Sequence, residues 1–258
     1  MEKQKIIIGN WKMAPKSLEE AKTVFQDIKK TAGKLSHVKT VICAPYIYQT
    51  ELKKLTKGEK FVVGSQDVSV ETEDAHTGEV SAEMLKNIGM EYVIVGHSER
   101  RAKGETNADL LKKITEVIKK EMTVVLCVGE KDRDEHGEYT KFIREQLLDV
   151  LQNFQKKNLD KLVIAYEPVW AIGKNAKREA TKEDVLETTI FIKKVLRDLF
   201  DEKNAAKIPL LYGGSVNQKN CAEYLTECDM DGLLVGRVSL QPEPFAKILT
   251  LADDIFKK

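Results

Sequence analysis

The sequence predicts an α/β protein, a single closed (β/α)8 barrel over residues 1–258. Eight short apolar runs alternate along the chain with amphipathic segments, the arrangement that gives parallel strands covered by helices. No linker rich in proline, glycine or serine divides the chain, and a length of 258 residues suits one barrel of eight units. An open, doubly wound sheet is the structural alternative. Its usual glycine fingerprint is missing, however, because the first apolar run continues into Gly9–Lys12.

The predicted strands are runs of aliphatic and β-branched residues, which suit strands buried on both faces. In chain order they are Ile6–Ile8, Val38–Ala44, Phe61–Gly64, Tyr92–Val95, Thr123–Val128, Leu162–Tyr166, Ile208–Tyr212 and Gly232–Val235.

Helix starts between these runs carry N-cap signals. Ser17 precedes a helix that we expect to reach about Ala32, and Thr106 and Thr181 open two further amphipathic helices. Pro242 is expected in the first turn of a final helix, where its missing N–H costs nothing.

Composition argues against several functional classes. The chain has 42 Lys and Arg against 41 Asp and Glu, so no overall charge drives binding to nucleic acid or to a membrane. It contains no apolar run near the length of a membrane span and no signal-peptide core, which predicts a soluble, cytoplasmic protein. The four cysteines form no Cys-x-x-Cys and the four histidines show no ligand spacing, so we expect reduced thiols and no metal site.

In a barrel the chemistry lies at the carboxyl ends of the strands, so each strand end is a candidate. Glu167 follows the run Leu162–Tyr166, and Pro168 then prevents the strand from continuing. The next residues, 169–173, form an apolar loop. A carboxylate on a rigid strand end under an apolar flap suits a general base, because burial favours its proton-bound form and the flap excludes water. The alternative is a helix cap or a partner for a lysine.

His97 stands at the end of the fourth run, beside a predicted helix N-terminus. Backbone N–H groups there favour a neutral imidazole, which can donate to a carbonyl and carry a proton. The alternative is an ordinary polar residue. Cys127 lies within the fifth run and Glu130 follows it, and we interpret them as a packing residue and a surface residue.

Asn10 and Lys12 follow the first run and flank Trp11, so their side chains point the same way if the backbone stays extended. A lysine at the barrel mouth suits an anionic substrate or a developing oxyanion. The alternative is a solvated surface lysine, the usual fate of this residue type.

Three further loops carry recognisable features. The turns 212–216 and 235–237 contain glycines after the seventh and eighth runs, where exposed N–H groups can hold a phosphate. The loop from Ser65 to Gly78 is long and irregular, and we expect it to form a subunit contact.

Together these strand ends resemble one enzyme family. The relevant segments are Gly9–Met13, Thr77–Glu79, Gly96–Arg101, Cys127–Glu130, Tyr166–Gly173, Tyr212–Val216 and Leu234–Gly236. In this order they resemble the triosephosphate isomerases over nearly the whole chain. The resemblance implies a TIM barrel that interconverts dihydroxyacetone phosphate and glyceraldehyde 3-phosphate, a step of glycolysis and gluconeogenesis.

The resemblance also implies roles for the site residues. Glu167 moves the proton between the two carbons, and neutral His97 polarises the carbonyl and moves protons between the oxygens. Lys12 stabilises negative charge, Asn10 orients the substrate, and Glu99 supports Lys12.

The phosphate is expected to bind to main-chain N–H groups, with the loop after Pro168 closing over it as a lid. The residues that the resemblance assigns to it, besides Asn10 and Lys12, are Gly173, Ser215, Gly236 and Arg237. No metal or organic cofactor is implied, because the carbonyl of the substrate itself acidifies the proton.

A homodimer is also implied, in which the loop from Ser65 to Gly78 inserts beside the active site of the partner. Thr77 would then approach Asn10 and Lys12 of the other subunit.

The lid departs from the common family pattern. Gly173 is followed by residues 174–181, a stretch two residues longer than in many members. Its cations Lys174, Lys177 and Arg178 either lie near the phosphate or are simply solvated, and we favour solvation.

Three single positions also depart from the pattern. Arg237 replaces a frequent glycine, so we expect an ordinary backbone conformation there. Asp67 and Asp74 replace a frequent asparagine and a frequent glycine, and they leave the shape of the third loop open.

Two alternatives to isomerisation remain at this stage. The first is a phosphosugar aldolase with Lys12 as the Schiff-base amine. The second is a non-catalytic barrel that binds phosphometabolites.

Overall fold

A computed structural model describes residues 5–72, 75–134, 136–173, 176 and 178–257. Its eight parallel strands close into a barrel in sequence order, with β1 paired to β8, so the predicted fold class is confirmed. The strands are β1 (Ile6–Asn10), β2 (Lys39–Ala44), β3 (Phe61–Ser65), β4 (Tyr92–Val95), β5 (Thr123–Val128), β6 (Leu162–Tyr166), β7 (Leu210–Tyr212) and β8 (Gly232–Val235).

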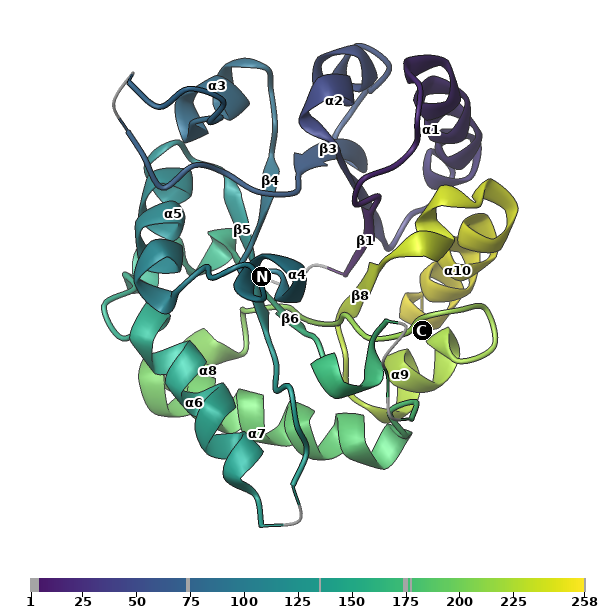
Figure 1. The fold of residues 1–258 in the computed structure, drawn as a ribbon. Coiled ribbons are helices and arrows are strands. Elements are labelled where there is room, and N and C mark those ends of the chain that lie inside the picture. Colours follow the sequence, from purple (N-terminus) through teal and green to yellow (C-terminus); the bar gives the residue numbers. More distant parts are fainter. Residues whose placement is uncertain (1–4, 73–74, 135, 174–175, 177, 258) are drawn as a thin grey trace.

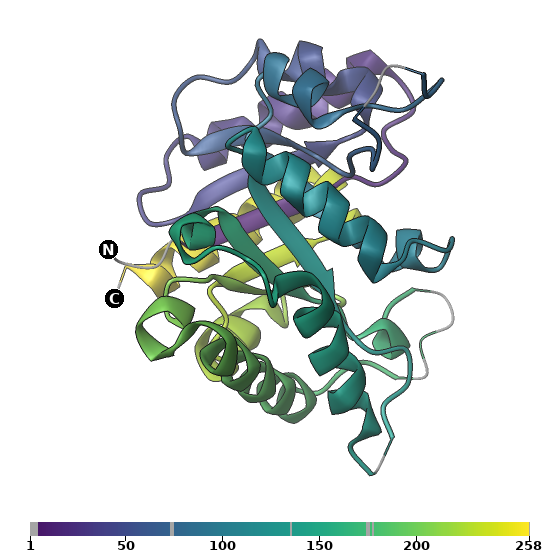
Figure 2. The ribbon, with the colours of Figure 1, turned by 90° about the vertical axis from the view of Figure 1, so that its left-hand side faces the viewer.

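The helices surround this ring of strands (Figure 1). The α-helices are α1 (Leu18–Ala32), α2 (Tyr46–Lys53), α3 (Ala82–Asn87), α4 (Ser98–Arg101), α5 (Asn107–Lys119), α6 (Glu138–Leu151), α7 (Lys182–Phe200), α8 (Glu202–Ala205), α9 (Cys221–Glu227) and α10 (Pro242–Phe256). Short 3-10 helices are η1 (Lys156–Lys161), η2 (Val169–Ala171) and η3 (Arg237–Leu240). Figure 2 shows α5 and α6 passing outside the strands.

The predicted helix starts are confirmed. Ser17 accepts a hydrogen bond from the first turn of α1, and Thr106 and Thr181 form complete capping boxes on α5 and α7. Pro242 is the first residue of α10. Each cap satisfies N–H groups that the helix itself cannot pair, which fixes where the chain turns back from the loop.

Alternate residues of each strand point into the barrel or toward the helices. Ile6 and Ile8 lie in the inner cluster with Cys127, whereas Ile7 belongs to the layer between strands and helices. Because both faces are buried, the strands are apolar almost throughout, as the sequence indicated. This packing makes the strand ends a rigid platform for the loops that follow them.

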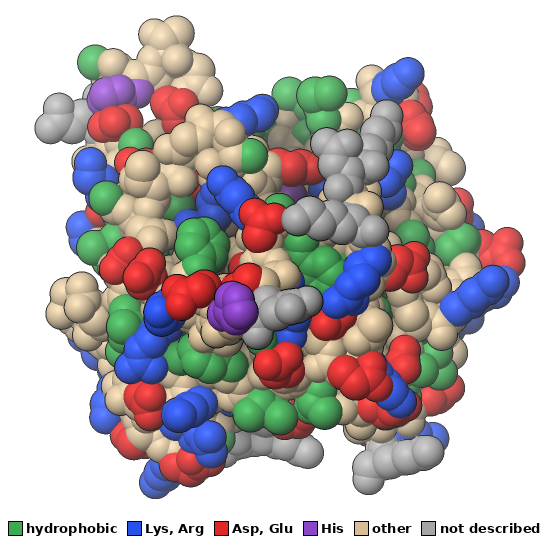
Figure 3. All heavy atoms as spheres, turned by 60° about the horizontal axis from the view of Figure 1, so that its bottom comes forward, with side chains coloured by type: hydrophobic (Ala, Val, Ile, Leu, Met, Phe, Trp, Pro, Cys, Tyr) green, Lys and Arg blue, Asp and Glu red, His purple; other side chains and the backbone are tan. Residues whose placement is uncertain are grey.

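The outer surface carries charges of both signs. Figure 3 shows acidic and basic side chains interspersed across the face that comes forward when the lower side of Figure 1 is tilted toward the viewer. Among the described residues, none of the helices is long and apolar enough to span a membrane.

Candidate active site

Glu167 lies at the carboxyl end of β6, with a side chain that is almost fully buried. Its backbone N–H donates to the carbonyl of Val128, the last residue of β5, at 2.8 Å. Gly129 follows, and a Cβ added there would lie 1.8 Å from the carbonyl oxygen of Glu167. Glu167 can therefore occupy this place only because residue 129 has no side chain. Gln146 of α6 holds Gly129 by accepting from its N–H at 2.8 Å.

His97 is the N-cap residue of α4 and is 8% exposed. Its Nδ1 accepts a hydrogen bond from the N–H of Glu99 at 3.2 Å, so this nitrogen carries no hydrogen. The hydrogen of the neutral ring is therefore on Nε2, which lies 3.1 Å from Oε1 of Glu167. In this arrangement Nε2 of the imidazole is the nitrogen that can donate a hydrogen bond, for example to a carbonyl oxygen.

Both oxygens of Glu167 are occupied in this arrangement. Oε1 faces His97, and Oε2 accepts from the backbone N–H of Ser98 at 2.9 Å. The carboxylate must turn away from at least one of these partners before it can contact another group. The structure therefore shows Glu167 in a resting position, with both oxygens paired.

The backbone conformation that places Lys12 and Asn10 at the site differs from the one that the sequence predicted. The backbone does not stay extended, because Lys12 has a φ of +54°. The condition for the expected alternation, an extended backbone, is therefore not met. The turn is closed instead by the N–H of Lys12, which donates to Oδ1 of Asn10 at 3.0 Å.

Lys12 pairs with Glu99 across the barrel mouth. Its Nζ lies 2.6 Å from Oε1 of Glu99, and Oε2 of the same carboxylate lies 3.9 Å from Nδ1 of His97. Partial burial acts to raise the pKa of Glu99, but the hydrogen bond and the charge of Lys12 lower it overall. Glu99 thus connects the ammonium to the imidazole, and with Asn10 these side chains line one hollow of about 400 Å³.

The two glycine-containing turns lie at the same end of the barrel, after β7 and β8. Ser215 is exposed, and its carbonyl accepts from Asn220 at 2.9 Å. A Cβ on Gly236 would lie 3.8 Å from Cε of Lys12, which places this turn against the site lysine. Arg237 begins η3 and is not among the described residues with positive φ, so its backbone is ordinary, as expected. Gly173, exposed and with a φ of +83°, follows η2.

The position of Glu130 differs from the one that the sequence predicted. It was expected at the surface, but only 1% of it is exposed. Its Oε1 accepts from the hydroxyl of Tyr166 at 2.9 Å and from Nε1 of Trp170 at 2.7 Å. Burial raises the pKa of this carboxyl, although the hydrogen bonds from Trp170 and Tyr166 oppose the shift. The sequence signal that could have indicated burial of Glu130 was its position next to Gly129, at the end of a barrel strand.

Arg178 in the lengthened loop is exposed, as expected, with 51% of its side chain accessible. The structure adds two contacts that the sequence did not predict: its guanidinium lies 4.6 Å from the centroid of the Trp170 ring and pairs with Asp184. Lys174 and Lys177 lie outside the described residues, as does Asp74 of the third loop.

Asp67 of the third loop pairs with Arg100 and with Lys113, which is 3% exposed. Burial raises the pKa of Asp67, and these cations oppose it.

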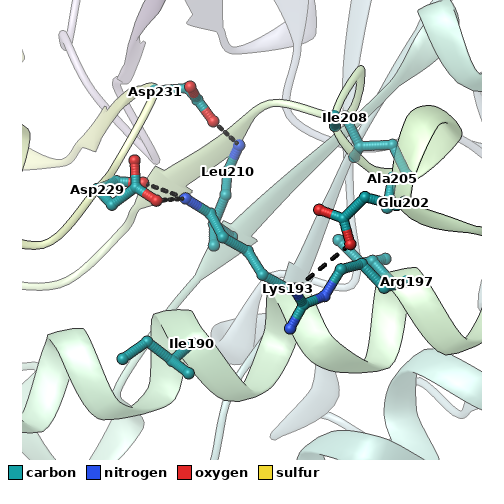
Figure 4. A pocket seen from close by; sticks show the side chains of 11 residues that line it. Ile190, Lys193, Arg197, Glu202, Ala205, Ile208, Leu210, Asp229 and Asp231 are labelled. Atoms are coloured by element: carbon teal, nitrogen blue, oxygen red, sulfur yellow. Dashed lines mark hydrogen bonds and ion pairs between the residues drawn. The ribbon is translucent and has the colours of Figure 1, made fainter.

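A second cavity, of about 510 Å³, lies at the other end of the barrel, where β7 and β8 begin (Figure 4). Its charged side chains are engaged with the protein. Lys193 pairs with Asp229, Arg197 with Glu202 at 3.4 Å, and Asp231 accepts from the N–H of Leu210 at 3.0 Å. Because it lies at the opposite end of the barrel, the cavity is separate from the candidate active site.

The geometry at the carboxyl end of the barrel defines a class of enzyme. A buried carboxylate and a neutral imidazole in contact can transfer protons at adjacent atoms, and a lysine beside exposed N–H turns can hold an anionic substrate. This combination is that of a (β/α)8-barrel enzyme that moves a proton next to a carbonyl group.

Comparisons with known proteins give the family. The family model described as Triosephosphate isomerase matches residues 5–252. The chain is 38% identical to the triosephosphate isomerase of Dictyoglomus turgidum over 249 residues, which cover 96% of this chain and 99% of the relative. It is 39% identical to that of Dehalococcoides mccartyi strain 195 over 257 residues, covering 99% and 100% of the two chains. The chain belongs to the triosephosphate isomerase family, and it is an enzyme.

Proposed function

We propose that this enzyme interconverts dihydroxyacetone phosphate and glyceraldehyde 3-phosphate, with Glu167 and His97 as its proton-transfer pair. The observation that carries the proposal is the contact between Oε1 of Glu167 and Nε2 of His97, at 3.1 Å, at the mouth of a closed barrel. Family membership supports the reaction, and the geometry supports the assignment of the residues.

The reaction follows from these groups. Glu167 takes a proton from C1 of dihydroxyacetone phosphate, and the electron pair moves onto the carbonyl oxygen to give an enediolate. His97 donates from Nε2 to this oxygen and takes a proton from the other one. Glu167 then returns its proton to C2, which yields glyceraldehyde 3-phosphate. Lys12, held by Glu99, offsets the negative charge that develops on the oxygens, and Asn10 orients the substrate.

The phosphate binds in this proposal to the turns after β7 and β8. Ser215, Gly236 and Arg237 contribute main-chain N–H groups, and Gly173 adds another when the apolar segment after Pro168 closes. Closure also excludes water. This protects the intermediate, because an enediolate phosphate left in water can lose its phosphate.

A coupled assay for each triose phosphate tests the reaction. Glu167→Asp keeps the charge but shortens the reach, so we expect kcat to fall by about 10²-fold or more with little change in thermal stability. Normal turnover by Glu167→Ala would show that the base is another residue. Borohydride in the presence of substrate separates the aldolase alternative, since only a Schiff base on Lys12 would be trapped.

We also propose a homodimer in which the loop from Ser65 to Gly78 contacts the partner. The hollow beside Lys12 supports this, because Met13 is 98% exposed and Ile47 78% exposed at its edge. Exposed apolar side chains grouped at a hollow are typical of a subunit contact. The described residues of the loop lie against the same hollow through Gln66 and Asp67.

A cytoplasmic location completes the proposal. Its support is the state of the four cysteines, which are all free thiols and buried. Such thiols are usual in proteins of a reducing compartment.

A further inference from the structure

Trp170, in the middle of η2, is held by polar and cationic groups as well as by packing. Its Nε1–H donates to Oε1 of Glu130 at 2.7 Å, and only 6% of the residue is exposed. The guanidinium carbon of Arg178 lies 4.6 Å from the centroid of the indole, and that of Arg133 lies 6.0 Å away. Both distances are within the range of cation–π attraction.

Arg178 is itself fixed to α7. Its Nη2 donates to Oδ1 of Asp184 at 3.0 Å, and its Nη1 pairs with Oδ2. Asp184 also accepts from the N–H of Thr181 at 2.9 Å, within the capping box of the helix. Arg178 therefore links the indole of Trp170 to the first turn of a helix of 19 residues.

A lysine could not make the same link. The planar guanidinium can lie over the indole and pair with a carboxylate through two nitrogens at once, whereas an ammonium is a single point of charge. Of the two cations over the ring, Arg178 is the nearer, at 4.6 Å against 6.0 Å for Arg133.

The link bears on the catalytic base through a short segment. Glu167 and Trp170 are separated by two residues, and one of them, Pro168, is rigid with a φ of −66°. Both oxygens of Glu167 are occupied by His97 and Ser98, so the base is held in its resting position. We expect a shift of the backbone at Glu167 to be carried through this short connection to Trp170.

We propose that Arg178 is a positioning residue that holds Trp170, and with it Glu167 and residues 169–173, in the resting arrangement. Substrate binding must break this hold. The proposal rests on the function proposed above, in which Glu167 is the base and this segment is the lid.

A contact that stabilises only the resting arrangement weakens the apparent affinity for substrate, since fewer molecules are ready to bind it. For Arg178→Ala we expect the KM for glyceraldehyde 3-phosphate to fall about two- to fivefold. The inhibition constant of inorganic phosphate should fall by the same factor, and kcat should stay within about twofold. Arg178→Lys should lie between this variant and the wild type.

Fluorine NMR of protein labelled with 5-fluorotryptophan reads the contact directly. The chain has two tryptophans, Trp11 and Trp170, and Trp170→Phe assigns the two signals. In Arg178→Ala the Trp170 signal should shift and broaden while that of Trp11 stays unchanged. Lys182→Ala is the matched control, because it removes an exposed ion pair with Glu227, at 2.7 Å, from the same turn of α7.

The outcomes separate this proposal from the proposed function. An unchanged Trp170 signal and an unchanged KM in Arg178→Ala would overturn it, and so would equal effects in Lys182→Ala. If the wild type itself fails to isomerise triose phosphates, the proposed function is wrong. The fluorine signals, titrated with inorganic phosphate, then still decide whether Arg178 holds Trp170 against ligand binding.

Discussion

The backbone N–H of Ser98 donates to Oε2 of Glu167 at 2.9 Å, and this bond joins the ends of two strands, β4 and β6, that are separated by β5. The imidazole of His97, the residue before Ser98, faces the other oxygen of the same carboxylate. One backbone turn, at His97 and Ser98, thus contacts both oxygens of Glu167. Four predictions follow from this site and its surroundings.

His97→Gln should lower kcat by about 10²-fold or more, because the amide can donate a hydrogen bond but cannot exchange protons between two oxygens. KM should change much less, since phosphate contacts are untouched. Steady-state kinetics with glyceraldehyde 3-phosphate measure both. His37→Gln is the control, because His37 is exposed and precedes β2 at the far end of the barrel. Equal losses in the two variants would contradict the role of His97.

Gly129→Ala and Gly213→Ala should affect the protein in different ways. A Cβ on Gly129 would overlap the carbonyl oxygen of Glu167 at 1.8 Å, so backbone must move and the free energy of unfolding should fall by about 3 kcal/mol or more. A Cβ on Gly213 would lie 3.0 Å from Cγ of Glu167 and 3.2 Å from the carbonyl oxygen of Tyr166, so the overlap is much smaller and falls mainly on the Glu167 side chain. We expect Gly213→Ala to lower kcat with a small change in Tm. Thermal unfolding and kinetics of both variants test this contrast.

Glu130→Gln should change how stability depends on pH. Burial raises the pKa of Glu130 in the folded protein above its ordinary value of 4.5, so folding favours the protonated form. The contribution of this group is fully favourable below the unfolded pKa and is lost as the pH rises through the folded one. Glutamine keeps the acceptor for Trp170 and cannot ionise.

The Tm of Glu130→Gln relative to wild type should therefore rise between pH 4 and the folded pKa of Glu130 and then level off. Calorimetry across this range, with Glu138→Gln as the control at an exposed site, measures the difference. A relative Tm that falls with pH would mean that Glu130 is stabilised as a carboxylate.

Met13→Asp and Ile47→Asp should weaken the proposed dimer, because each puts a charge on an apolar side chain at the edge of the hollow beside Lys12. Light scattering over a concentration series measures the mass. Ile190→Asp is the control, since Ile190 is 57% exposed on α7, at the second cavity. A wild-type protein that is monomeric at all concentrations would exclude the proposed contact.

Local patterns were sufficient for the elements that the sequence predicted well. Strands β4, β5, β6 and β8 have the predicted bounds, and helix α1 ends at Ala32 as expected. Ser17, Thr106 and Thr181 marked helix starts because an N-cap bonds to residues only a few positions away. The start of β7 was placed two residues early, at Ile208, because apolar character alone does not show where strand pairing begins.

The sequence alone determined the barrel and the side chains that face its mouth, since the alternation of strands and helices sets the topology and the strand ends set the position of Glu167, His97 and Lys12. Only the tertiary structure decided the contacts between distant segments. It buried Glu130 under Trp170, turned the backbone at Lys12, and placed Arg178 over the same indole. These contacts depend on which loops meet across the barrel mouth, and no periodicity or spacing within one segment carries that information.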